Sequence, residues 1–506
     1  MTRSAATYSK LVEHLQRTEL LRSTASVLGW DEQTYMPPGG AEHRSQQLGL
    51  LAGLAHEWST RPEIEEWISE LEQSELMQAR DSAAAVNIRE ARRDYDRLTK
   101  LPRSLVEEQS RVATLSQQAW MEARKESKFA KFLPWLEKTV DLKRQEAQCL
   151  GIPAGGIPYD ALLDQYEPGM TAANIRRLFT PLREGLVQLL NRIRDSKRVP
   201  PREILTRSYP IPAQRDFSIE TAKRIGFSFQ DGRLDVATHP FCSGFGPGDT
   251  RLTTRYDEHF FPDAFFGTLH EAGHGIYDQG LDRSAFGLGM GGAVSLGIHE
   301  SQSRMWENFV GRSRSFWTYH YPLAQKAFPD VLRDVSLDQF YAAINDVQPT
   351  YIRVEADEVT YNLHILLRFE LEQPIVSGDL QPRDVPAVWN ETFERYFGLK
   401  VQNDAQGCLQ DIHWSGGGIG YFPTYTLGNM NAAQLFEAAD AKIGPLAGQF
   451  AAGEYQPLKA WLNEQIHRRG KQYPAHELIQ VVTGRPLDHE PLLRHLHAKF
   501  GPLYQL

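Results

Sequence analysis

The chain has 506 residues, of which 41% are hydrophobic and 24% are charged, an ordinary globular composition that allows a substantial core. Its 64 acidic and 55 basic residues give a net charge of −9, which argues against a nucleic-acid partner. Cys149, Cys242 and Cys408 are widely spaced and odd in number, so we expect neither a disulfide framework nor a cysteine zinc site.

The N-terminal segment, residues 1–30, is amphipathic, and charged residues interrupt every apolar run. It therefore lacks the apolar core of a signal peptide. No other stretch approaches the length of a membrane span. We expect a cytoplasmic protein that has no membrane partner.

Helical spacing dominates the first third of the chain, from residue 6 to about 149, with a break at the Pro- and Gly-rich residues 36–40. Residues 151–171 are rich in Gly and Pro, and they are either a domain boundary or a structured wall of a cleft. A further helix is expected over 172–194. We expect an N-terminal helical region, 1–150, that forms a cleft wall and a catalytic region, 151–506, within one continuous domain.

Alternating apolar and polar residues mark a different segment, residues 224–256. The alternation over 226–230 and 233–236, separated by Asp231 and Gly232, predicts a hairpin, and 251–256 predicts a third strand. We therefore expect a small antiparallel sheet in a mainly α protein. Helical patterns return after Pro262, with a glycine-rich break at 415–420.

The main chemical signal is His270-Glu271-Ala272-Gly273-His274. Histidines four residues apart lie on one helical face, where both rings can bind one ion, and Glu271 lies beside them. Pro262 and Gly280 suit the two ends of such a helix. An accidental His-Glu-x-x-His is expected in roughly 3–4% of chains with this histidine content, so context must decide.

A third ligand is needed, because catalytic zinc usually has three protein ligands and one open position. Glu300 is our candidate, on a second predicted helix over 294–310 that the glycine-rich segment 287–292 can lay against the first. Asp278, one turn beyond His274, is a candidate for supporting an imidazole, and a solvated acid at the helix end is the alternative. Zinc suits these ligands, and cobalt or manganese could replace it.

Several further motifs resemble the thermostable carboxypeptidase Taq family of zinc metallocarboxypeptidases. The resemblance covers essentially the whole chain. It rests on the zinc motifs at 270–274 and 299–301 and on other matches in the same order, namely His239-Pro240-Phe241, Asp249-x-Arg251-x-Thr253, Ile352-Arg353-x-x-Ala356-Asp357 and Gly407-x-x-Gln410-Asp411-x-His413-Trp414. Trp30-Asp31 and residues 34–37 are also similar to the family.

The resemblance implies a helical, cleft-bearing fold with a small sheet, usually as a homodimer. It also implies release of single C-terminal amino acids from peptides with broad specificity, proline being poorly released. Glu271 is then the base that takes a proton from the attacking water and returns it to the leaving amine.

An enzyme of this kind must recognise a free carboxylate, for which arginine is well suited. Arg353 is our first candidate and Arg251 the second, although each could instead form an internal ion pair, with Asp357 or Asp249. His413, Tyr421 and Tyr425 are candidates for contacting the substrate or the developing oxyanion. Asp411 could orient His413 or neutralise an arginine, and His239 could shape the cleft or support the metal ligands.

Two other functions remain open at this point. A helical zinc oligoendopeptidase or peptidyl-dipeptidase would use the same zinc chemistry, and the size of the released product distinguishes it. A non-catalytic helical scaffold would have no need of Glu271, which is intact.

Overall fold

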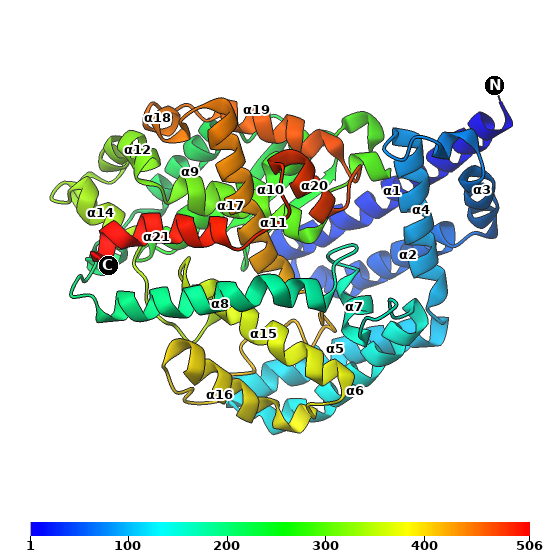
Figure 1. Cartoon of the computed structure of the whole chain (residues 1–506), viewed down its shortest axis with the longest axis horizontal. Helices are drawn as coiled ribbons and strands as arrows, with labels where there is room; N and C mark the ends of the chain where they lie inside the picture. Colours follow the sequence, from blue (N-terminus) through cyan, green and yellow to red (C-terminus); the bar gives the residue numbers. More distant parts are fainter. Residues whose placement is uncertain (1) are drawn as a thin grey trace.

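Helices make up most of the protein, as the spacing of its apolar residues predicts (Figure 1). The computed structural model describes residues 2–506. Its α-helices are α1 Arg3–Thr34, α2 Ala41–Ser59, α3 Pro62–Glu72, α4 Ala83–Lys100, α5 Arg103–Glu126, α6 Phe129–Leu150, α7 Pro158–Leu163, α8 Ala172–Asp195, α9 Ile211–Ile225, α10 Phe261–Gly280, α11 Leu296–Arg304, α12 Arg314–Ala327, α13 Pro329–Leu332, α14 Leu337–Ile344, α15 Thr360–Ser377, α16 Val385–Phe397, α17 Pro423–Ile443, α18 Leu446–Ala451, α19 Gln456–Gln465, α20 Ala475–Thr483 and α21 Glu490–Tyr504.

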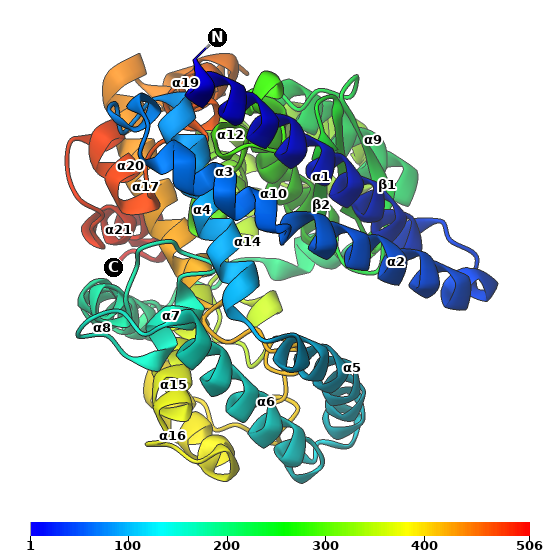
Figure 2. The ribbon, with the colours of Figure 1, turned by 90° about the vertical axis from the view of Figure 1, so that its right-hand side faces the viewer.

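One large apolar core runs through most of these helices. It includes buried residues from Trp120 on α5 to Tyr504 on α21. The first helices have a smaller core of their own, in which Leu11 of α1, Ile64 and Ile68 of α3 and Ile88 of α4 are buried. Figure 2 shows α5, α6, α15 and α16 gathered below and α10, α12 and α17 above, with α1 to α4 along the upper part.

The predicted sheet is present, but its strands and pairing differ from the prediction. The strands are β1 Gly232–Val236, β2 Cys242–Gly246 and β3 Asp249–Thr254, in the order β1-β3-β2. β2 pairs antiparallel with β3, whereas β1 pairs parallel with it, so the sheet is mixed rather than antiparallel.

The hairpin predicted at Asp231 and Gly232 was wrong for a local reason. Residues 226–230 are not a strand, because Gly226 ends α9 in a left-handed conformation and the Phe227 amide donates back to the Ala222 carbonyl. The hairpin instead joins β2 and β3 through Pro247 and Gly248. The spacing of β2 was missed because two of its five residues are glycine.

The predicted helices agree more closely with the structure. The break at 36–40, the helix at 172–194 and the helix of the His-Glu-x-x-His motif, which begins near Pro262 and ends at Gly280, are all confirmed. The helix expected over 294–310 is α11, continued by a π-helical turn at Met305–Gly311. The segment 151–171 contains one short helix, α7.

A cavity of about 320 Å³ lies between the N-terminal helices and the catalytic elements. Its walls include Glu19 of α1, Glu90 of α4, Gly244 of β2 and Asp278 of α10. Within residues 2–506, no helix is long and apolar enough to cross a membrane.

Candidate functional site

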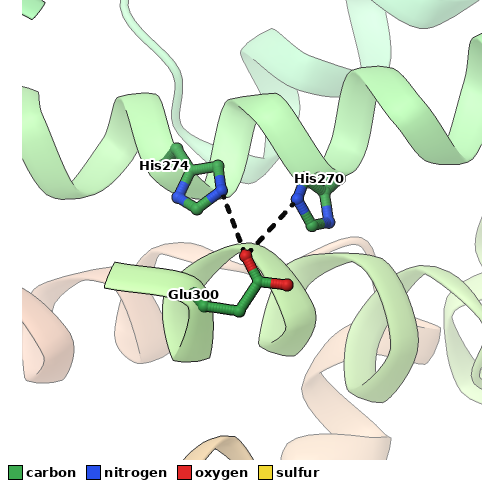
Figure 3. A group of neighbouring side chains, drawn as sticks. All are labelled: His270, His274 and Glu300. Carbon is green, nitrogen blue, oxygen red and sulfur yellow. Dashed lines mark ion pairs between the residues drawn. The ribbon is translucent and has the colours of Figure 1, made fainter. Parts of the chain in front are cut away.

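Three predicted metal ligands face one another across two helices (Figure 3). His270 and His274 project from α10, and Glu300 projects toward them from α11. The Oε2 atom of Glu300 lies 3.7 Å from Nε2 of His270 and 3.4 Å from Nε2 of His274. One ligand atom from each residue lies within 4.8 Å of the others, so the three can share one ion.

Glycines let the helices approach closely enough to form this cluster. A Cβ on Gly273 of α10 would lie 2.6 Å from the Gln302 carbonyl oxygen of α11. A Cβ on Gly428 of α17 would lie 2.5 Å from Cγ of Glu300. Side chains at these two positions would therefore push α11 away from α10 or displace the third ligand.

A carboxylate that the sequence analysis did not single out supports His270. Nδ1 of His270 lies 2.9 Å from Oε2 of Glu307, which lies in the π-helical turn Met305–Gly311. Arg304 holds both acids, since its Nε donates to Glu300 over 2.7 Å and its Nη1 donates to Glu307 over 3.1 Å. Glu307 follows Glu300 by seven residues, close to two helical turns, and this spacing was the signal in the sequence that could have indicated it.

The second ligand, His274, is supported through another histidine. Its Nδ1 lies 2.5 Å from Nδ1 of His299, whose Nε2 lies 3.0 Å from Oδ1 of Asp278. If His299 donates to Asp278, its Nδ1 is free to accept the Nδ1–H of His274. Asp278 is therefore connected to His274 only through His299, and not directly as the sequence analysis considered.

These contacts leave the cluster suited to a divalent metal ion. Both Nδ1 atoms have partners, so the lone pairs on Nε2 of His270 and His274 point to the shared centre. Burial lowers the pKa of His274 to about 4, which keeps the ring neutral. Burial alone would raise the pKa of Glu300, but Arg304 and His270 lower it far below its ordinary value. Burial alone would lower the pKa of His270, but Glu300 and Glu307 raise it, so this ring loses a proton when it binds a metal ion. Two imidazoles and one carboxylate are a typical catalytic zinc set.

Glu271 lies beside the ligands and is only 7% exposed. Burial raises its pKa to about 7. It makes no hydrogen bond to any of residues 2–506, so its carboxylate is free to take a proton.

A chain of polar contacts links the metal ligands to Arg353. The guanidinium of Arg304 lies 4.3 Å from the ring centre of Tyr361, whose hydroxyl accepts from Nη1 of Arg353 over 3.0 Å. Arg353 also donates twice to Oδ1 of Asp411, over 3.0 and 2.9 Å. Its internal partner is thus Asp411, and not Asp357 as the sequence analysis considered.

Three aromatic candidates lie next to Arg353. Nε2 of His413 lies 3.3 Å from the Tyr425 hydroxyl, and the ring centres of His413 and Tyr421 are 5.3 Å apart. The Arg353 guanidinium lies 5.1 Å from the ring centre of Tyr425. Burial lowers the pKa of His413 to about 4, so this ring is neutral near pH 7.

Two other candidates lie apart from this group. Arg251 pairs with Asp249 through two hydrogen bonds of 2.8 and 2.7 Å, and its guanidinium lies 4.3 Å from the Trp30 ring centre. His239 is exposed, and its carbonyl accepts from Thr253. Neither side chain contacts His270, His274, Glu300 or Arg353 among the residues that the structure describes.

Comparisons with known proteins show which family the whole chain resembles. The family model for carboxypeptidase Taq (M32) metallopeptidases matches residues 10–500. Thermostable carboxypeptidase 1 of Thermus thermophilus is 46% identical, over 100% of this chain and 100% of that protein. Carboxypeptidase 1 of Bacillus subtilis is 37% identical, over 99% of each chain. A crystal structure of an M32 carboxypeptidase from Deinococcus radiodurans R1 is 37% identical, with a TM-score of 0.95 over 99% of this chain and 100% of that chain.

Proposed function

The chain belongs to the carboxypeptidase Taq (M32) family of metallopeptidases, and on that premise we propose that it releases single amino acids, one after another, from the C-termini of peptides. The family resemblance seen in the sequence motifs is thereby confirmed, and the protein is a metallocarboxypeptidase. Broad specificity and poor release of proline are part of the proposal, and they rest on the family resemblance alone.

Zinc is the ion that we propose for the site, held by His270, His274 and Glu300, with cobalt or manganese as alternatives. When bound, the ion supplies Lewis-acid activation of water and of the scissile carbonyl. Glu271 takes the proton from the attacking water and returns it to the departing amine. The support is its position beside two ligands and its freedom from internal hydrogen bonds.

Arg353 is the residue that we propose for docking the C-terminal carboxylate, and this arginine is the observation that favours an exopeptidase. Three of its five N–H groups are used by Asp411 and Tyr361, which leaves one N–H on each terminal nitrogen. Such a pair suits a carboxylate. Arg251 is the weaker candidate, because it pairs with Asp249 beside Trp30, whereas Arg353 is linked through Tyr361 and Arg304 to Glu300.

The developing oxyanion needs a donor besides the metal. We propose His413, Tyr425 or Tyr421 for this contact with the substrate, because all three gather beside Arg353. Tyr425 lies in the first turn of α17, the helix that also passes Glu300 at Gly428. The Tyr425 hydroxyl is therefore on the same helix, α17, that lies against both Arg353 and Glu300.

Product analysis tests the proposed reaction. The zinc-loaded protein is incubated with one defined peptide, in free-acid and C-terminally amidated forms, and the products are identified by mass over time. We expect single amino acids first, and a preference for the free acid of roughly 10–150-fold in kcat/KM, the worth of a charge-assisted hydrogen bond. Dipeptides or internal fragments as first products would favour a peptidyl-dipeptidase or an oligoendopeptidase.

Two variants separate the roles of the two acids. Glu271→Gln should keep zinc and lose roughly 10²–10⁴-fold in turnover, because the amide is a poor proton acceptor. Glu300→Ala should instead lose zinc, as measured by elemental analysis. The opposite pattern would mean that the roles are exchanged, and full activity of both variants would contradict both proposed roles.

We further propose a homodimer that acts on free peptides in the cytoplasm. The assembly rests on the family resemblance, and light scattering of the purified protein tests it. The location is likewise a proposal, and fractionation of the source cells tests it.

A further inference from the structure

One buried carboxylate, Asp411, is shared by two arginines. Its Oδ1 accepts from Arg353, and its Oδ2 accepts from Nε of Arg368 over 2.6 Å. Arg368 comes from α15, and its Nη1 donates to the His364 carbonyl over 2.6 Å. Its side chain is 1% exposed, whereas that of Arg353 is 7% exposed, so only Arg353 has a part within reach of a ligand.

The buried group carries more positive than negative charge. Two guanidinium groups, which stay charged at all ordinary pH values, face one carboxylate. Burial alone would raise the pKa of Asp411, but both arginines lower it far below its ordinary range, so it is ionised. Burial lowers the pKa of His364 and of His413, and both rings are neutral near pH 7.

The other nearby groups do not cancel this excess. Burial raises the pKa of Tyr361 and of Tyr425, so both hydroxyls keep their protons. Glu370, the next acid on α15, pairs with Arg183 and accepts from Tyr396. Glu372 accepts from Tyr159, Trp414 and Gly420 instead of Arg368, and burial raises its pKa to about 7, so it carries little negative charge below that pH. Arg304, on the far side of Tyr361, has its own partners in Glu300 and Glu307.

We propose that Arg368 is a specificity-determining residue that acts without touching the substrate: it neutralises Asp411, so that Arg353 keeps an uncompensated positive charge for the C-terminal carboxylate of the peptide. The inference rests on the proposed docking role of Arg353. Without Arg368, Asp411 and Arg353 would form a neutral pair, and the attraction for a terminal carboxylate would fall.

The guanidinium of Arg368 is also held in place and away from water. Arg368 is held between the Trp389 ring, 4.6 Å from its guanidinium carbon, and the Phe422 ring, at 5.3 Å. Water does not reach it, so the field of its charge is less screened than that of a surface arginine. The same burial explains why it serves the site from behind Asp411 and does not bind a ligand itself.

The experiment compares one peptide in free-acid and amidated forms with three zinc-loaded proteins. The wild type is set against Arg368→Met, which removes the charge, and Arg368→Lys, which keeps it. We expect the ratio of kcat/KM for free over amidated peptide to fall about tenfold in Arg368→Met, the difference between a charge-assisted and a neutral hydrogen bond. The fall should come from a higher KM for the free acid, and Arg368→Lys should retain most of the ratio.

Each outcome distinguishes a charge role from a structural one. An unchanged ratio in Arg368→Met, or an equal loss on both peptides, would overturn the inference while leaving the docking role of Arg353 intact. A wild type that cleaves both forms equally would overturn the docking role itself, and this inference with it.

Asp411→Asn provides an independent variant should Arg368→Met fail to fold. It removes the negative charge from the cluster, so the preference for the free acid should be at least that of the wild type. A lower preference in this variant, with zinc content unchanged, would contradict the charge argument.

Discussion

A buried carboxyl remote from the metal, Glu372, makes the stability of the protein depend on pH. It accepts hydrogen bonds from Tyr159, Trp414 and the Gly420 amide over 2.8, 2.9 and 3.0 Å. Burial raises its pKa from 4.5 to about 7, even though these donors favour the ionised form. The folded protein therefore binds this proton more tightly than the unfolded chain does.

A group of this kind stabilises the fold fully below about pH 4.5, and its contribution is lost as the pH rises to about 7. At about 1.4 kcal/mol for each unit of pH across that interval, the loss is roughly 3 kcal/mol. Glu372→Gln cannot ionise, so it removes this pH dependence. Relative to the wild type, the variant should gain roughly 3 kcal/mol between pH 4.5 and pH 7.5.

Urea unfolding followed by circular dichroism, at several pH values and one zinc concentration, measures the difference. Any constant effect of the amide on packing cancels, because only the change of the difference with pH is used. Glu167, buried where it accepts from the Gly297 amide at the start of α11, has its pKa raised to about 7 by burial and should respond likewise in Glu167→Gln. Parallel pH profiles for the wild type and both variants would refute the reasoning.

Two further predictions concern the metal ligands. Glu307→Gln should weaken zinc binding by roughly 10–100-fold, because the charged acceptor of His270 is lost. Competition with a chelator measures the affinity. An unchanged affinity would show that Glu307 contributes packing alone and does not support the ligand. Gly428→Ala should lower zinc occupancy, since its Cβ would lie 2.5 Å from Cγ of Glu300. Gly448→Ala is the control, because its Cβ would have no atom within 4 Å and zinc occupancy should not change. Equal zinc content in the two variants, by elemental analysis, would contradict the steric argument.

The grouping of His270, His274 and Glu300 could be predicted because its geometry is largely local. Residues four apart on a helix share a face whatever surrounds them, so His270 and His274 followed from spacing alone. Placing Glu300 beside them required only a second helix and a reversal of the chain, and the structure has both. The ends of α10 also agreed, because Pro262 and Gly280 act on the adjacent backbone.

The supporting residues could not be predicted, because their roles depend on distant parts of the chain. Nothing near Arg368 in the sequence indicates that it shares Asp411 with Arg353, 58 residues from Asp411. His299 belonged to a recognised motif, yet its part between His274 and Asp278 appears only when α10 and α11 meet. The prediction of an antiparallel sheet failed for the same reason, since the parallel pairing of β1 with β3 depends on contacts between segments that are apart in the sequence.

The two supports behind the metal ligands act on the same chemical property. Glu307 fixes the Nδ1 proton of His270, and the pair of His299 and Asp278 fixes that of His274. Each ring is thereby oriented with its Nε2 toward the shared centre. Burial alone would lower the pKa of His270, but Glu300 and Glu307 raise it, so this ring favours a proton before an ion binds. Because these hydrogen bonds already orient both rings, part of the cost of assembling the site falls on folding, and metal binding has to displace only the proton that His270 favours.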